Sequence, residues 1–381
     1  MNKQQAPSRL PCILSTVYLC IAMYLICLWM LPRVQLPPAP LPRLLWVLTF
    51  YGAITFAARY IHGFLHELGH LFSGLICGYH FLSFRLFSLL LIKEKGKRKL
   101  RRFRTPGAFT QCLMSPPETA AEEYPIVLPM LGAPLMNLLC GAVFGVLGVY
   151  MVHLPFIAAF LFMLAATGLQ FTLLDAIPFS TGGIRSDAKN AMLLRSSAEN
   201  RRNFRILFLI EKKLQEGVRL GDMPEEWFTL SSDLQMQNSF YASLSLQICD
   251  RLMEQHKFRE AHSLLRHLLS IDSALTPIER SFMNCHLIFT ELIGENRPQF
   301  VRELLTPSLH QFMNAAPDYL TVLRTRYVYT LLQERDPQAA QPYKDRIMEK
   351  AKNYPCPWEV DRELELIAIA EAAAVHQASP I

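Results

Sequence analysis

The sequence predicts a mainly α-helical fold, in which a polytopic membrane core of about four spans precedes an all-α helical-repeat domain. The 381-residue chain is 51% hydrophobic, and its mean hydropathy of +0.18 is high for a soluble protein. Its apolar residues gather in the first half, whereas the sequence from residue 188 onward is polar and helix-rich. In the second half, helix pairs recur about every 40 residues, a spacing typical of helical repeats.

Four apolar segments are long enough to cross a bilayer as helices, which takes about 20 residues. They are residues 13–31, 44–65, 126–152 and 154–174. The first and last segments contain no charged residue, and only Arg59 and His62 interrupt the second. The first segment is not interpreted as a signal peptide, because no small-residue cleavage pattern follows it and further spans come after it.

The charge distribution predicts how these spans are oriented. Between Lys93 and Arg104 there are eight Lys or Arg and one Glu, whereas the loop at 32–43 contains only Arg33 and Arg43. Basic loops stay in the cytoplasm, so four spans place both termini there as well. The basic cluster and the net charge of +6 are then explained by anionic lipid headgroups, and we expect no nucleic-acid partner. The nine scattered cysteines form no CxxC pair, which argues against a disulfide framework and a cysteine zinc site.

An HExxH motif, His66-Glu67-Leu68-Gly69-His70, follows directly after the second apolar run. On a helix, two histidines four residues apart project from one face and can hold one Zn²⁺, with Glu67 beside them as a base that takes a proton from water. His62 extends the same stripe, but it lies about 12 Å from His70 along a straight helix. His62 is therefore expected to support the site without binding the same ion.

The predicted topology brings two carboxylates to the same membrane face as the motif. A hydrolytic zinc site usually has three protein ligands and one open position. The second and fourth spans both end in the cytoplasm, and the fourth is followed by Asp175 and then Asp187. Either carboxylate could complete the site on this reasoning. Within the third span, Asn137 must face protein, because an unpaired amide is costly in lipid.

These motifs, in this order, resemble the site-2 protease family of intramembrane zinc metalloproteases. The matching residues are His66–His70, the run Gly132-Ala133-Pro134-Leu135-Met136-Asn137, and the segment Ile177-Pro178…Gly182-Gly183…Ser186-Asp187. The resemblance covers residues 40–215. It implies that His66, His70 and Asp187 bind zinc, that Glu67 is catalytic, and that Asn137 binds the substrate chain. An interhelical hydrogen bond is the alternative role for Asn137.

The sequence departs from the family pattern at two positions. Asp175 stands where the family usually has Asn, and Ala188 follows Asp187 where Gly is usual. Asp175 thus remains the alternative third ligand, or a carboxylate that orients a histidine. The expected function is zinc-dependent cleavage of membrane-embedded or membrane-anchored proteins, in a bacterial inner membrane. The alternative is a catalytically impaired membrane scaffold that recruits partners through its helical-repeat domain.

The remaining segments complete the predicted organisation. Residues 1–190 form the expected protease core, 191–235 an amphipathic linker, and 236–381 a cytoplasmic helical-repeat domain that loosely resembles tetratricopeptide repeats. Stacked helix pairs make concave surfaces, so this domain could bind a cytoplasmic protein. Residues 78–115 suggest a short membrane-associated strand pair beside the site, and related proteases have a hairpin there whose edge aligns an extended substrate.

The topology can be tested with reporter fusions on the full chain. A reporter placed after residue 104 or at the C-terminus is expected to read cytoplasmic, and one near residue 38 external, because the basic loop stays inside. The opposite pattern would place the HExxH motif and the two carboxylates at the external face and refute the topology.

Overall fold

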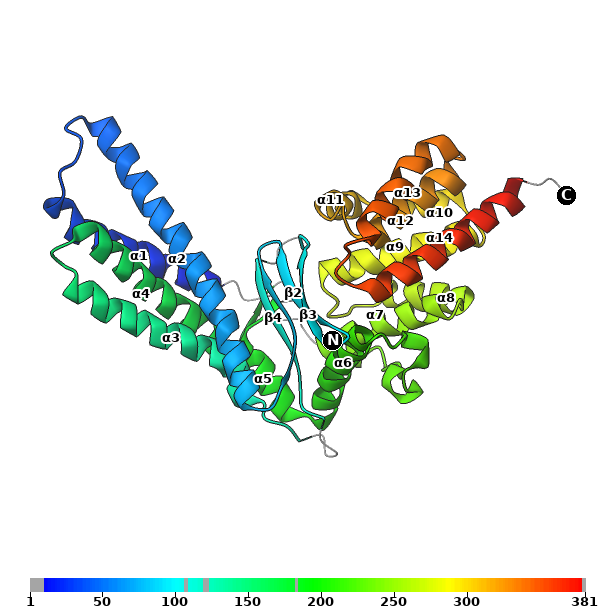
Figure 1. The fold of residues 1–381 in the computed structure, drawn as a ribbon, viewed down its shortest axis with the longest axis horizontal. Helices are drawn as coiled ribbons and strands as arrows, with labels where there is room; N and C mark the ends of the chain where they lie inside the picture. The colour runs from blue at the N-terminus through cyan, green and yellow to red at the C-terminus, as the bar shows by residue number, and fades with distance from the viewer. Residues whose placement is uncertain (1–9, 106–108, 119–122, 182–183, 379–381) are drawn as a thin grey trace. The chain divides into compact units, whose positions relative to one another are not determined.

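In the computed structural model, the chain folds into two compact units (Figure 1). The first comprises residues 1–81 and 110–201, and the second comprises residues 82–109 and 202–381. The structure describes residues 10–105, 109–118, 123–181 and 184–378. Gly182 and Gly183 of the predicted site segment lie outside these ranges.

Four helices of the first unit are long and apolar enough to cross a membrane, which confirms the prediction of four membrane-length segments. They are α1 (Leu10–Met30), α2 (Pro40–Ile76), α3 (Val127–Tyr150) and α4 (Pro155–Ala176). Prolines begin α2 and α4, where the missing N–H needs no partner. Side chains along α1 are largely exposed, as expected of a lipid-facing surface.

Helix α2 extends well beyond the predicted apolar run. It continues to Ile76 and ends where Gly78 adopts a positive φ of 78°. The HExxH motif therefore lies inside the same continuous helix that spans the apolar segment. Because α2 is continuous through the motif, the two histidines keep helical spacing.

Several polar side chains inside the apolar bundle are paired with one another. Arg59 on α2 donates to Gln170 Oε1 on α4 at 3.4 Å, and Gln170 Nε2 donates to the Ser15 hydroxyl on α1 at 2.8 Å. Polar groups without water need such partners. This chain of contacts links three of the four helices.

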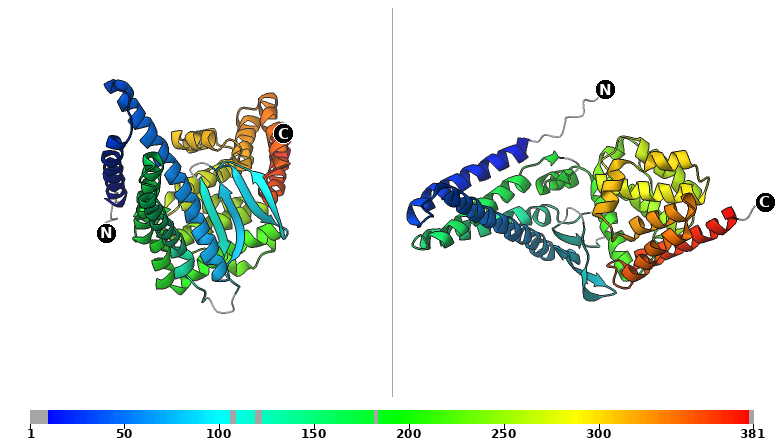
Figure 2. Two further views of the ribbon diagram at one scale, coloured as in Figure 1. Left: turned by 60° about the vertical axis from the view of Figure 1, so that its left-hand side comes forward. Right: turned by 90° about the horizontal axis from the view of Figure 1, so that it is seen from above.

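The strands between residues 80 and 115 form a four-stranded sheet in the order β3-β2-β1-β4 (Figure 2). They are β1 (His80–Leu86), β2 (Leu89–Glu94), β3 (Lys97–Arg102) and β4 (Thr110–Ser115). Strands β1, β2 and β3 pair antiparallel, with Leu91 opposite both Phe84 and Leu100. The predicted strand pair is thus part of a larger sheet.

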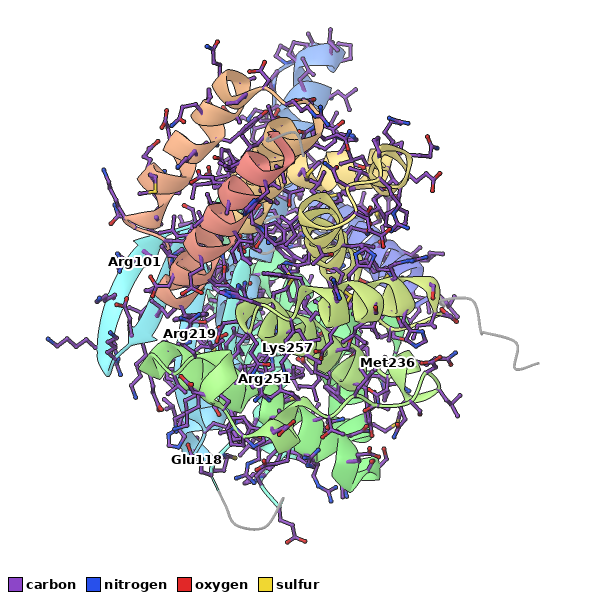
Figure 3. All side chains as sticks on the ribbon, turned by 90° about the vertical axis from the view of Figure 1, so that its right-hand side faces the viewer. Arg101, Glu118, Arg219, Met236, Arg251 and Lys257 are labelled. Carbon is purple, nitrogen blue, oxygen red and sulfur yellow. The ribbon has the colours of Figure 1, made fainter. Side chains whose placement is uncertain are left out.

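Part of the basic run between Lys93 and Arg104 forms strand β3, in addition to the predicted strand pair. Glu94 on β2 accepts from Lys99 at 2.6 Å and from Arg101 at 3.2 Å, which partly neutralises the strand (Arg101 is labelled in Figure 3). Opposite charges across a strand pair stabilise a sheet. Glu94 therefore helps to stabilise the strand that this cationic segment forms.

The segment expected as a linker is mostly helical. It contains the end of α5 (Asp187–Ser196) and all of α6 (Ala198–Glu216). Ile206, Ile210 and Leu214 on α6 are buried in a small core. This apolar face is therefore covered by protein and is not free to lie on a membrane surface.

Within the second unit, the described residues from 239 to 378 are mainly helical, as predicted for residues 236–381. The helices are α7 (Ser239–Glu254), α8 (Phe258–Ser270), α9 (Pro277–Ile293), α10 (Pro298–Leu304), α11 (Pro307–Ala315), α12 (Leu320–Val328), α13 (Pro337–Ala351) and α14 (Pro357–Ala378). Three inter-helix turns contain a non-glycine residue with positive φ, at His256, Asn296 and Arg335. This recurrence matches the predicted spacing of about 40 residues, but membership of the tetratricopeptide class stays a prediction.

A buried network of charges links the helices of the second unit. Arg324 on α12 and Glu363 on α14 are both fully buried and lie 2.9 Å apart. Asp250 on α7 lies 3.1 Å from His286 on α9 and 3.1 Å from Arg362 on α14. Because each buried charge is stabilised by its partner, loss of one partner leaves the other buried without a counter-charge.

The network predicts a difference in stability between two matched substitutions. Glu363→Gln should lower the free energy of unfolding by about 3–5 kcal/mol, since it leaves Arg324 buried without its counter-charge. Asp318→Asn, which removes a half-exposed partner of Arg346 and Lys350, should cost about 0–1 kcal/mol. Denaturant unfolding of the purified full chain measures both values, and equal small losses would contradict the assignment.

Candidate metal centre

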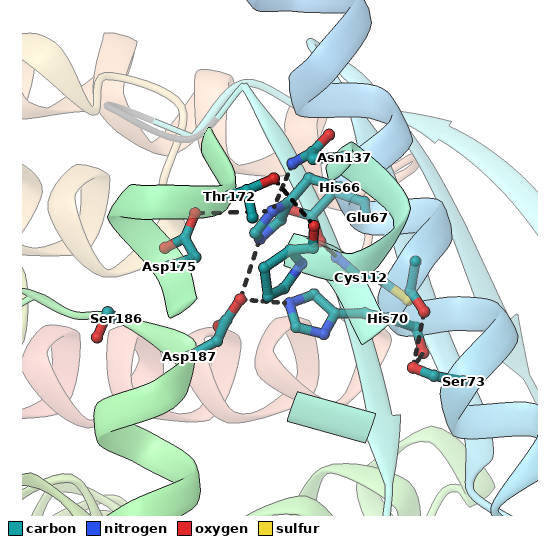
Figure 4. Close-up of polar contacts among 12 residues, drawn as sticks. His66, Glu67, His70, Ser73, Cys112, Asn137, Thr172, Asp175, Ser186 and Asp187 are labelled. Atoms are coloured by element: carbon teal, nitrogen blue, oxygen red, sulfur yellow. Dashed lines mark hydrogen bonds and ion pairs between the residues drawn. The ribbon is translucent and has the colours of Figure 1, made fainter. Parts of the chain in front are cut away.

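Helix α2 presents His66 and His70 on one face, one turn apart, and their ring centroids lie 5.0 Å apart (Figure 4). The spacing of four residues produces this arrangement on any straight helix. Both rings are largely buried, with 15% and 19% of their side-chain surfaces exposed. The motif thus supplies two adjacent imidazoles, as the sequence predicted.

Asp187 reaches the histidines as the first residue of α5, and Ser186 fixes its position. The Ser186 hydroxyl donates to the carbonyl of Ile177 at 2.7 Å and accepts from the backbone N–H of Lys189 at 3.3 Å. It therefore closes the loop that leaves α4 and also caps α5. These contacts direct the Asp187 carboxylate to His66 and His70 within α2.

The three side chains meet at distances that suit a shared metal ion. Asp187 Oδ2 lies 3.4 Å from Nε2 of His66 and 3.4 Å from Nε2 of His70. In a tetrahedral zinc site with bonds of about 2.1 Å, neighbouring ligand atoms are about 3.4 Å apart. His66, His70 and Asp187 are the group of three potential ligands found among the described residues.

The environment of Asp187 gives a second reason to infer a cation here. Its Oδ2 atom is buried and makes no hydrogen bond. An unpaired buried carboxylate oxygen is costly, and a divalent cation between the three ligand atoms would offset that cost. Two histidines and one carboxylate fit zinc, and the same donor set also fits Fe(II).

Asp175, the alternative ligand, occupies a different position. It lies in the last turn of α4, and its Oδ2 is 3.7 Å from Nδ1 of His66. That nitrogen is on the opposite side of the imidazole from the Nε2 atom that faces Asp187. The geometry therefore favours Asp187 as the ligand and leaves Asp175 beside the ring of His66.

The outer nitrogens of both histidines have partners on α3. His70 Nδ1 lies 2.9 Å from the carbonyl oxygen of Pro129, which can only accept a hydrogen bond. Nδ1 therefore carries the hydrogen, and Nε2 of His70 is free to bind metal. His66 Nδ1 lies 3.2 Å from Nδ2 of Asn137. Asn137 also contacts His62, and its side chain is fully buried. Its predicted contact with substrate stays a prediction.

Glu67 is held in place by strand β4. The backbone N–H of Cys112 donates to Glu67 Oε2 at 2.7 Å. Burial raises the pKa of the Cys112 thiol to about 12, with the nearby charge of Glu67 as a further cause, so the thiol stays protonated at neutral pH. The backbone groups of Cys112 and Pro129 had no signal in the sequence, whereas His62 was marked by its helical spacing.

Asp187 and Asp175 should respond differently to substitution. Asp187→Ala is expected to abolish metal retention, because it removes a ligand oxygen. Asp175→Asn should leave the metal bound, with at most a 10–100-fold loss of affinity if the carboxylate orients His66. Metal content of the purified full chain after dialysis measures both effects. Retention by the Asp187 variant together with loss by the Asp175 variant would reverse the assignment.

No family model, no curated protein and no solved structure matches the chain.

Proposed function

We propose that this chain is a zinc-dependent endopeptidase that cleaves membrane-embedded or membrane-anchored proteins, and that it belongs with the site-2 proteases that its motifs resemble. The observation that supports this most is the convergence of His66, His70 and Asp187 beside Glu67. These residues lie in the unit that contains four membrane-length apolar helices. A hydrolytic site in that setting suits substrates that reside in the bilayer.

The proposed reaction is hydrolysis of a peptide bond. Zinc held by the three ligands would polarise the scissile carbonyl and increase the acidity of water. Glu67 accepts a proton from the attacking water while the water oxygen bonds to the carbonyl carbon. When the C–N bond breaks, Glu67 returns that proton to the leaving amine. The hydrogen bond from Cys112 keeps the carboxylate in one orientation during both transfers.

Strand β4 offers a means of holding the substrate. It stands at one end of the strand order, and its Cys112 N–H points to Glu67. A helical substrate must unwind before its carbonyl can reach the metal position, and exposed backbone groups of an edge strand can replace the lost hydrogen bonds. We propose that the substrate chain lies extended along this edge.

Location and partners follow from the same proposal. The protein would be a multi-pass protein of the bacterial inner membrane with both termini in the cytoplasm, where the basic strand β3 could meet anionic headgroups. The helix pairs of the second unit would then be available to a cytoplasmic protein partner.

Glu67→Gln separates chemistry from metal binding. The glutamine amide oxygen can still accept from Cys112, and all three ligands remain, so metal content should be unchanged. Loss of the general base should lower the cleavage rate by about 10²–10⁴-fold. The measurement compares membrane proteins of cells that express either form and identifies any that accumulate uncut.

The exposed Glu349→Gln on α13 is the matched control and should behave as the wild type. Cleavage by the Glu67 variant at the wild-type rate would eliminate Glu67 as the base. Absence of zinc from the purified wild type would instead favour the scaffold function.

A further inference from the structure

A buried chain of hydrogen-bonding side chains extends from His66 into the helical bundle. His66 Nδ1 lies 3.2 Å from Asn137 Nδ2, and Asn137 Oδ1 lies 3.0 Å from His62 Nδ1. His62 and Asn137 have no exposed surface. Helix α4 closes the far end, because a Cβ at Gly168 would lie 2.6 Å from His62 Cε1.

The hydrogen bonds that connect His66, Asn137 and His62 must have one direction of donation if His66 is to bind metal. Its Nε2 faces Asp187 and must be unprotonated, so Nδ1 carries the hydrogen and needs an acceptor. Asp175 Oδ2 lies 3.7 Å from this nitrogen, beyond hydrogen-bond distance, whereas the nearer amide atom of Asn137 lies 3.2 Å away. Asn137 can accept a hydrogen bond only through Oδ1. The two ends of an amide differ little in shape, so rotating it by 180° exchanges Oδ1 and Nδ2 within the same space. In that orientation Nδ2 donates to His62 Nδ1.

The same direction of hydrogen bonding also sets the tautomer of His62. When Nδ1 of His62 accepts a hydrogen bond from the Asn137 amide, the hydrogen of the neutral ring is on Nε2. That nitrogen is buried and makes no hydrogen bond with the described residues.

We propose that Asn137 is a positioning residue that fixes the metal-binding tautomer of His66, and that His62 holds Asn137 in the required orientation. This inference rests on the proposed metal centre. Both ligand histidines then have their tautomer set from outside the centre. For His70 the acceptor is the carbonyl of Pro129, and for His66 it is Oδ1 of Asn137, whose orientation His62 maintains.

The three histidines on this face of α2 then have different roles. His66 and His70 bind the ion, whereas His62, one turn earlier on α2, supports the acceptor of His66. It also explains why a polar amide is buried within an apolar helix, where an unpaired amide would be unfavourable. Asn137 satisfies both of its polar ends with histidines of one neighbouring helix.

The test is zinc affinity, measured on the purified full chain by competition with a chelator. Asn137→Leu has a similar volume and no acceptor, and it should weaken zinc binding by 10–100-fold, the usual effect of losing a partner of a ligand histidine. Asn137→Asp keeps an acceptor oxygen and should bind zinc within about threefold of the wild type. His62→Leu should lie between them, because it leaves the acceptor in place and removes only its support.

Thr167→Val is the matched control. Thr167 is fully buried on α4, and its hydroxyl makes no hydrogen bond, so the substitution should leave zinc affinity unchanged. The tautomer of His66 provides a second readout that does not depend on how a variant folds. Nitrogen NMR of the wild type with labelled histidine should show Nδ1 protonated and Nε2 bound to the metal.

The outcomes separate this inference from the proposed function. Equal zinc affinity of the Asn137→Leu variant and the wild type, or a wild-type His66 protonated at Nε2, would overturn the role of Asn137 and leave the protease proposal standing. A wild type that binds no zinc would overturn the metal centre itself. Equal affinity of the His62→Leu variant and the wild type would remove His62 from the inference.

Discussion

The close approach of α2 and α3 at Gly69 is the constraint on which the candidate centre depends. A Cβ at Gly69 would lie 2.6 Å from the Cα of Ala133 and 2.6 Å from the carbonyl oxygen of Gly132. The two backbones therefore touch within the HExxH motif itself. Small residues permit such approaches between membrane helices, where dispersion and hydrogen bonds drive association. Only at this separation can the outer nitrogens of His66 and His70 reach α3.

The same crossing explains how two separate helices make one site. His70 meets a carbonyl near the start of α3, and His66 meets Asn137 two turns later. Ser186 then delivers Asp187 from the loop that follows α4. The histidines are thus oriented from outside and the carboxylate is positioned by a helix cap, so the three potential ligand atoms are held close together by the fold itself. A larger residue at Gly69 would separate the helices and disturb all of these contacts together.

Much of this arrangement followed from the sequence. Apolar length gave the four segments, and helical spacing placed His66 and His70 on one face, because both signals are local. The predicted topology brought Asp175 and Asp187 to the motif, but it left open which of them is the third ligand. That choice depends on the loop closed by Ser186. The strand formed by Lys97–Arg102 was missed, because its pairing depends on Glu94 across the sheet. The contacts of Cys112 and Pro129 were beyond prediction, because every residue has the backbone groups that make them.

We propose that His66, His70 and Asp187 bind one zinc ion. Zinc X-ray absorption of the purified full chain is the most direct test, because it reports the ligand atoms and their distances. We expect about one zinc per chain, with imidazole nitrogens at about 2.0–2.1 Å, carboxylate oxygen at about 2.0–2.2 Å and no sulfur. Sulfur ligands at about 2.3 Å, or a chain that retains no zinc, would contradict it.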